Sequence, residues 1–207
     1  MSSQKQKIIL AHTRAKVRAL FAAHPVKAHG FDHVFRVANW AVQIAKGEKA
    51  SIFLCEMAGL LHDIGRTQEK GGPAITGATH HELSYKMLRE WFLEDRFFDD
   101  LTKKEKIILL YSARYHWNNA ADKYDVAWIL RDADKMDGFG KIGLLRMREV
   151  YNNNVEAMDT ALRLQFDAYF LLITKTARKI VEDKKMIEPT VGLYKKLLKA
   201  RIKQVEL

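Results

Sequence analysis

Apolar residues recur along most of the chain at spacings of three and four, which is the period of an amphipathic α-helix. The stretch from Ser51 to Leu61 is the clearest case, because Leu54, Met57 and Leu61 fall on one face. Ser51 is suited to cap the start of this helix, and Gly65 is suited to end it. No segment shows the alternation that predicts a β-strand. The pattern therefore predicts an all-α fold.

Spacing and capping residues predict the other helices in the same way. We expect helices at about 5–23, 32–46, 80–93, 103–116 and 125–137. A further helical stretch follows the glycines at 138, 140 and 143 and runs to 151, and two more helices cover 158–183 and the residues from 190 onward. Asp32 is expected to cap the second helix and Gly47 to stop it. Thr79–Glu82 and Thr102–Glu105 both match the capping box. The chain should therefore contain roughly ten helices.

Composition narrows the class of protein. The 207 residues are 48% hydrophobic, enough for one sizeable core. Cys55 is the single cysteine, which excludes an internal disulfide framework, and its place in an apolar helix favours a buried structural thiol over a nucleophile. The first residues lack the apolar region of a signal peptide, and no uncharged apolar run approaches about 18 residues. We therefore expect a cytoplasmic protein without a membrane partner.

The formal net charge of +10 suits an anionic partner. Basic residues are spread along amphipathic helices and are denser from 184 to 203. No basic segment is interleaved with aromatic residues in the manner of a single-strand-binding protein. Nucleic acid is therefore the less favoured partner, and a small anionic substrate the more favoured one.

Candidate chemistry lies at helix ends. His62 and Asp63 follow the apolar run and would be buried at its last turn, where two adjacent polar groups are costly unless something pairs with them. His33 and Asp134 share the apolar faces of their own predicted helices. Imidazole and carboxylate are both good ligands of divalent metals, so these four residues predict a metal site.

His80 and His116 extend this set to six potential ligands from five predicted helices. Such a mixed nitrogen and oxygen set suits Mn, Fe, Co, Ni or Zn, and suits Mg less well. One or two metals per chain fit the set, since Asp63 can bridge a pair. Either His80 or His81 can point inward, and His81 is expected to lie in solvent. Two further carboxylates near Asp134 are read as surface or helix-end groups: Asp132 and Asp137.

Four short sequence motifs resemble those of a known family. They are His29-Gly-Phe-Asp-His33-Val-Phe-Arg-Val, Leu60-Leu-His62-Asp63-Ile-Gly-Arg66, His80-His-Glu-Leu-Ser84 and Arg131-Asp-Ala-Asp134-Lys-Met-Asp137-Gly. In this order they resemble the HD-domain superfamily of metal-dependent phosphohydrolases, and in particular its small stand-alone bacterial members. The resemblance covers roughly residues 25–150.

The resemblance implies roles for individual residues. The family's metal ligands match His33, His62, Asp63 and Asp134. His80 and His116 match positions that hold a second metal or substrate in some members, although those members usually show two consecutive histidines where this chain has Tyr115-His116. The implied fold is an HD-type helical bundle in one domain over 1–207, with 151–207 as a C-terminal helical extension that packs on the core.

The function predicted from this site is metal-dependent hydrolysis of a nucleotide or another small phosphoester. Asp63 would orient the attacking water or accept its proton, while Arg66 and Lys135 would neutralise charge on the phosphate. Two alternatives stay open: a di-iron oxygenase of the same fold, and a non-catalytic, metal-containing module that binds a ligand or nucleic acid. The C-terminal extension can also form a homo-oligomer contact.

Overall fold

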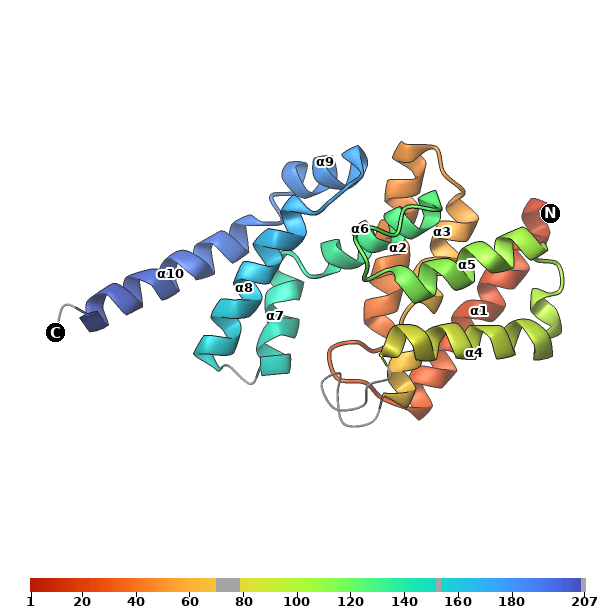
Figure 1. Cartoon of the computed structure of the whole chain (residues 1–207), viewed down its shortest axis with the longest axis horizontal. Helices are drawn as coiled ribbons and strands as arrows, with labels where there is room; N and C mark the ends of the chain where they lie inside the picture. The colour runs from red at the N-terminus through yellow and green to blue at the C-terminus, as the bar shows by residue number, and fades with distance from the viewer. Residues whose placement is uncertain (70–78, 152–153, 206–207) are drawn as a thin grey trace.

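The computed structural model describes residues 1–69, 79–151 and 154–205, and within these ranges the chain is helical without a β-strand. The predicted all-α class is confirmed. Ten α-helices lie in the described ranges: α1 Ser3–Ala23, α2 Phe31–Glu48, α3 Ile52–Leu61, α4 His80–Glu94, α5 Lys103–Tyr115, α6 Asp125–Asp137, α7 Gly140–Tyr151, α8 Val155–Phe170, α9 Lys175–Asp183 and α10 Glu188–Val205 (Figure 1). Two short 3₁₀ helices join them at Ile64–Gln68 and Arg96–Phe98.

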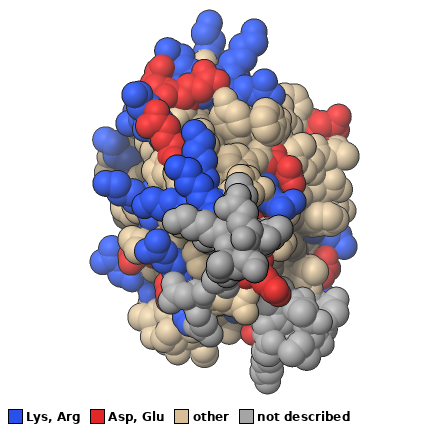
Figure 2. All heavy atoms as spheres, turned by 90° about the vertical axis from the view of Figure 1, so that its left-hand side faces the viewer, with Lys and Arg blue, Asp and Glu red and all other residues tan. Residues whose placement is uncertain are grey.

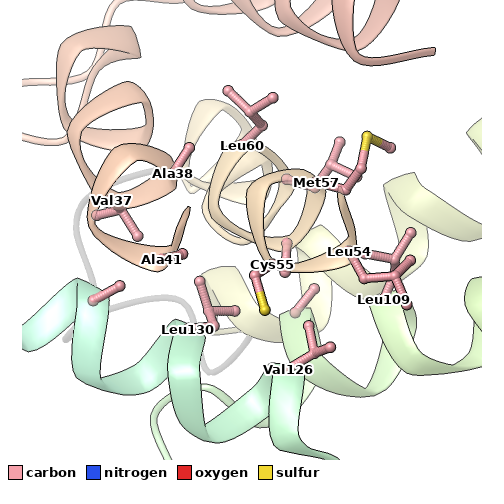
Figure 3. Packing of buried hydrophobic residues seen from close by; sticks show 14 of the residues in the cluster. Val37, Ala38, Ala41, Leu54, Cys55, Met57, Leu60, Leu109, Val126 and Leu130 are labelled. Carbon is pink, nitrogen blue, oxygen red and sulfur yellow. The ribbon is translucent and has the colours of Figure 1, made fainter. Parts of the chain in front are cut away.

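The core forms where α3 packs between α2, α5 and α6 (Figure 3). Cys55 points into this core beside Ala41 and Leu130, and all three side chains are fully buried. Burial raises the pKa of the Cys55 thiol to about 12. The thiol is therefore protonated at neutral pH, and its burial agrees with the expected structural thiol.

Two glycines let helices approach more closely than any other residue would allow. A Cβ added at Gly59 of α3 would lie 2.4 Å from the Cα of Ala38 in α2. A Cβ added at Gly65 would lie 2.3 Å from the backbone nitrogen of Ser84 in α4. Gly65 does not end α3 as expected, because His62 caps that helix and Gly65 belongs to the following 3₁₀ helix. Because Gly65 has no side chain, the backbone of α4 can pack directly against this turn.

Several predicted helix ends shift for local reasons. Helix α2 is capped by Gly30 and continues through Gly47, which packs against Thr176 of α9, so both expected ends were wrong. The capping box at Thr102 and Glu105 is confirmed by both of its reciprocal hydrogen bonds. The box predicted at Thr79 is wrong.

In α4 the Thr79 side chain makes no capping hydrogen bond. The Glu82 carboxylate instead lies 2.9 Å from Nε of Arg114 in α5. An ion pair between helices has therefore replaced the local cap.

The single helix predicted over 158–183 is wrong, because the chain breaks between α8 and α9. The buried carboxylate of Asp132 accepts hydrogen bonds from the backbone nitrogens of Ile173 and Thr174 and from the Thr174 hydroxyl. Thr174 in turn caps α9 through the backbone nitrogen of Ala177. Asp132 is thus an internal anchor of the turn rather than the surface or helix-end group that we expected.

The C-terminal helices pack along α6 and α7. Helix α9 contacts α2 and α6, α8 contacts α6 and α7, and α10 contacts α7 and α8 while its far end projects away from the other helices (Figure 1). Leu162 of α8 is fully buried in a separate small cluster with Met147 and Leu193. A single domain with 151–207 as an extension stays a prediction. None of the helices in the described ranges combines the length and apolar content that crossing a membrane requires.

Gly59→Ala should destabilise the protein, since its methyl group must push α2 and α3 apart; overpacking of this kind costs about 1–3 kcal/mol. Gly192→Ala is the matched control, because nothing lies within 4 Å of a Cβ at this helical position. Gly192→Ala should leave the free energy of unfolding unchanged or raise it by up to about 1 kcal/mol. Urea unfolding followed by circular dichroism would measure both, and equal stabilities for Gly59→Ala and wild type would contradict the close approach.

Candidate metal centre

Six side chains that the sequence singled out meet where helix ends converge. They are His33 in the first turn of α2, His62 at the end of α3, Asp63 directly after it, His80 at the start of α4, His116 at the end of α5 and Asp134 in the last turn of α6. Each of these helices carries buried apolar residues that pack in the common core, and this packing brings the polar helix ends together. All six are buried except Asp134, whose side chain is 34% exposed.

The inner atoms of four of these residues face one another. Nε2 of His33 lies 3.4 Å from Oδ1 of Asp134 and 3.6 Å from Oδ2 of Asp63. Nε2 of His62 lies 3.7 and 3.8 Å from the same two oxygens of Asp63 and Asp134. One atom each of His33, His62 and Asp134 fall within 4.8 Å of one another. This spacing leaves room between the atoms for an ion.

Buried atoms without partners test whether a metal fits this set. Nε2 of His33, Nε2 of His62 and Oδ1 of Asp63 are buried and make no hydrogen bond within the described part of the chain. Buried polar atoms are costly unless they are paired, and imidazole nitrogen with carboxylate oxygen is a typical donor set for first-row divalent metals. The donor set therefore fits a divalent transition metal.

The outer ring nitrogens of three histidines are already hydrogen-bonded. Nδ1 of His62 donates to the carbonyl of Gly59 and Nδ1 of His116 to that of Ala113, both at 2.9 Å. A carbonyl can only accept, so these bonds place the ring proton on Nδ1 and turn the Nε2 lone pair inward. Such outer hydrogen bonds orient ligating histidines in metal sites.

Asp137 holds His33 in the same way. It is the last residue of α6, so the helix-end position allowed by the sequence is confirmed, but the alternative of a surface position is wrong. Its side chain is buried, with Oδ2 2.7 Å from Nδ1 of His33 and Oδ1 2.6 Å from Nε of Arg36. Arg146 contacts the same carboxylate. Burial alone would raise the pKa of Asp137, but the bonds to His33 and Arg36 hold it below the ordinary value. The signal was present, because residues 134 and 137 lie three apart on one side of a helix.

A second group of histidines adjoins the first. His80, His81 and His116 bring one nitrogen each within 4.8 Å of one another. Nε2 of His80 lies 3.5 Å and Nε2 of His116 lies 3.7 Å from Oδ1 of Asp63. His81 is half-buried with its ring centroid 4.7 Å from that of His116, so the expectation that it lies in solvent was wrong. Asp63 stands between the two groups.

The protonation states of His62, His80 and Asp63 favour ligation, whereas hydrogen bonds to Asp137 and Asp63 outweigh burial and raise the pKa of His33. Burial lowers the pKa of His62 to about 4 and that of His80 to about 2, so both rings are neutral at pH 7. Burial would raise the pKa of Asp63, but His62 and Arg66 hold it well below its usual range. Neutral imidazole and ionised carboxylate are the forms that bind metals.

Cationic side chains surround the cluster. Nε of Arg66 donates to Oδ2 of Asp63, and Nζ of Lys135 lies 2.7 Å from Oδ1 of Asn119. Arg146 lines the same cavity as Asp134 and Lys135. Sequence reasoning missed Arg146, because it lies on α7 outside every motif and only its tertiary contacts with Ala28 and Asp137 bring it near.

Comparisons with known proteins agree with this geometry. The model of the HD domain family matches residues 30–138, which contain all six clustered side chains. Uncharacterized protein L803 of Acanthamoeba polyphaga mimivirus is 26% identical over 184 residues, which cover 76% of this chain and 73% of that protein.

Solved structures share the fold over almost the whole chain. Bacillus subtilis YpgQ in complex with ADP superposes with a TM-score of 0.70 at 19% identity, covering 95% of this chain and 96% of that one. An HD-superfamily hydrolase from Bacillus thuringiensis superposes with a TM-score of 0.69 at 19% identity, covering 95% of this chain and 99% of that one. A predicted HD-superfamily hydrolase from an uncultured Thermotogales bacterium superposes with a TM-score of 0.65 at 25% identity, covering 92% of this chain and 91% of that one. Since the family match spans more than half of the residues, the chain belongs to the HD domain family.

Proposed function

We propose that this protein is a metal-dependent phosphohydrolase that acts on a nucleotide or another small phosphoester. One observation carries the proposal: Nε2 of His33 and Nε2 of His62 are buried without hydrogen-bond partners in the described structure and face carboxylate oxygens of Asp63 and Asp134. Outer hydrogen bonds orient both histidine rings. The description of two structural neighbours as HD-superfamily hydrolases supports hydrolysis. The ADP in the Bacillus subtilis YpgQ complex supports a nucleotide as the first substrate class to test.

His33, His62, Asp63 and Asp134 would hold the metal, with Mn, Fe, Co, Ni or Zn favoured by the donor set. His80 and His116 would hold a second metal or contact the substrate. When bound, the metal would supply Lewis acidity, polarising a phosphoryl oxygen and lowering the pKa of water toward about 7.

Asp63 is suited to orient the attacking water. One of its oxygens accepts the Arg66 hydrogen bond, whereas Oδ1 has no hydrogen-bond partner within the described residues. Its low pKa keeps it an acceptor at neutral pH, so it can take a hydrogen bond from water without itself carrying a proton. The contact with Asp63 gives Arg66 a positioning role in addition to the phosphate contact predicted from the sequence.

Lys135 and Arg146 would stabilise charge on the phosphate. Both line the cavity that includes Asp134. Burial lowers the pKa of Lys135 to about 8, so the ammonium group is still largely protonated at pH 7. Fixed positive groups next to a reacting phosphate act where negative charge develops, and they need no rearrangement during the reaction.

The His80, His81 and His116 group is the observation that favours a second candidate, the di-iron oxygenase. Two irons per chain with oxygen consumption would support it. A non-catalytic module that binds nucleic acid has less support. Figure 2 shows Lys and Arg side chains over the face at the α10 end interrupted by acidic groups, rather than one continuous basic surface.

Asp63→Ala should abolish metal binding and hydrolysis together, because it removes a ligand shared by both histidine groups. Elemental analysis should find at least one transition metal per wild-type chain, with the content falling in the variant. Turnover of a nucleotide and phosphomonoester panel with Mn²⁺ should fall by at least about 10²-fold. Asp183→Asn is the control, since this exposed carboxylate pairs only with Lys179 among the contacts described. Undiminished turnover in Asp63→Ala would refute the assignment.

Asp137→Asn should weaken metal binding by about 10–100-fold, the usual effect of losing an outer carboxylate partner of a ligating histidine. Asp132→Asn is a matched control, because it changes a second buried carboxylate of α6 whose hydrogen bonds go to the α8–α9 turn. That variant should lower the melting temperature but leave metal affinity within about twofold. Metal titration and thermal unfolding of both variants separate the two roles. Equal metal affinities in the two variants would show that Asp137 does not position His33.

A further inference from the structure

A cavity of about 310 Å³ lies between α6, α7 and α8, and Asp134 forms part of its wall. Asp134 is the most exposed of the four proposed metal ligands, since the side chains of His33, His62 and Asp63 are at most 2% exposed. The proposed centre is therefore accessible at Asp134, on the side where this cavity lies. Its volume falls at the lower end of the roughly 300–1,000 Å³ that small-molecule sites occupy.

The walls of the cavity carry large apolar side chains that folding leaves exposed. Leu164 is 57% exposed, Val150 is 43% exposed and Tyr151 is 37% exposed. Phe139, which is buried, also lines it. Single exposed apolar residues need no explanation, but several around one cavity indicate a surface that a ligand covers. The two aromatic rings can stack with or pack edge-on against a ring of the ligand.

Two of the polar side chains in the lining, Gln165 and Arg146, already have partners within the protein. Nε2 of Gln165 donates to the carbonyl of Gly138, and its Oε1 accepts from the Thr190 hydroxyl, both at 2.6 Å. Arg146 donates to the carbonyl of Ala28 and to Asp137. A hydroxyl-rich group placed against Gln165 would lose water without gaining equivalent hydrogen bonds, which is costly. An apolar or aromatic group would lose nothing comparable.

We propose that this cavity binds the organic group of the phosphoester and selects an aryl ring, such as a nucleobase, over a sugar. The inference rests on the proposed function, because it places the phosphate at the Asp134 end. Lys135 and Arg146 line this same cavity, so their charges lie close to a phosphate held there. Apolar walls and nearby cations together match a phosphoester whose organic group carries an aromatic ring.

Binding to chelator-treated protein tests the cavity independently of hydrolysis. AMP, phenyl phosphate and glucose 6-phosphate share a phosphate and differ in the organic group. Calorimetry should give AMP and phenyl phosphate at least about tenfold tighter binding than glucose 6-phosphate. Saturation-transfer NMR should show the strongest transfer at ring protons. Binding of AMP alone would identify a nucleobase site, and binding of both would identify a general aryl site.

Leu164→Gln should weaken both aryl ligands about tenfold, since it replaces an apolar wall with an amide. Leu145→Gln is the control, because Leu145 is an exposed apolar residue of α7 that does not line the cavity. In the metal-loaded enzyme, the same change at Leu164 should raise KM for phenyl phosphate and leave kcat nearly constant. This kinetic measurement decides the question if chelation unfolds the protein.

Glucose 6-phosphate binding as tightly as AMP and phenyl phosphate would overturn the cavity assignment, as would unchanged aryl binding in Leu164→Gln. Aryl binding that depends on Leu164, in a protein that hydrolyses no phosphoester with any metal, would instead remove the proposed function and leave the cavity assignment in place. Failure of the two proposals can therefore be told apart.

Discussion

The structure depends on burying ionisable side chains that face one another without hydrogen bonds between them. Nε2 of His33 and His62 and Oδ1 of Asp63 lie in the interior, where unpaired polar atoms cost free energy of folding. The carboxylate of Asp137 and the backbone carbonyl of Gly59 satisfy the outer nitrogens of His33 and His62, whose inner nitrogens face Asp63 and Asp134. A bound divalent metal would supply the missing partner, so metal binding would add to the stability of the fold.

This constraint explains why the helices pack so closely around one point. Gly59 allows α3 to contact the α2 backbone, and Gly65 allows the start of α4 to reach the turn that carries Asp63. Helix α6 contributes two buried carboxylates besides Asp134, and they point to different tasks. Asp137 holds His33 of α2, whereas Asp132 holds the turn that begins α9. The same helix therefore connects the candidate centre with the C-terminal helices.

Charge around the centre is balanced locally and positive overall. Arg66 pairs with Asp63, and Arg36 and Arg146 pair with Asp137, so three arginines are partly neutralised by carboxylates. Lys135 and Arg146 nevertheless line the cavity at Asp134, within a chain whose formal net charge is +10. An anionic substrate would meet cations that the carboxylates hold in place, and such preorganisation lowers the cost of binding. The apolar cavity walls would then decide which organic group accompanies the phosphate.

The sequence determined most helices and the main candidates for the centre. Periodicity predicted α3 and α6 closely, because a buried helix face repeats apolar residues at a fixed spacing. The motifs that contain His33, His62-Asp63 and Asp134, in this order, indicated the family. Only the tertiary structure decided contacts between distant segments. The break between α8 and α9 depends on a carboxylate some 40 residues earlier, and the place of Arg146 depends on helix packing. Asp137 was read as a surface or helix-end group and His81 as a group in solvent, because local spacing records one helix face, whereas burial depends on what packs against it.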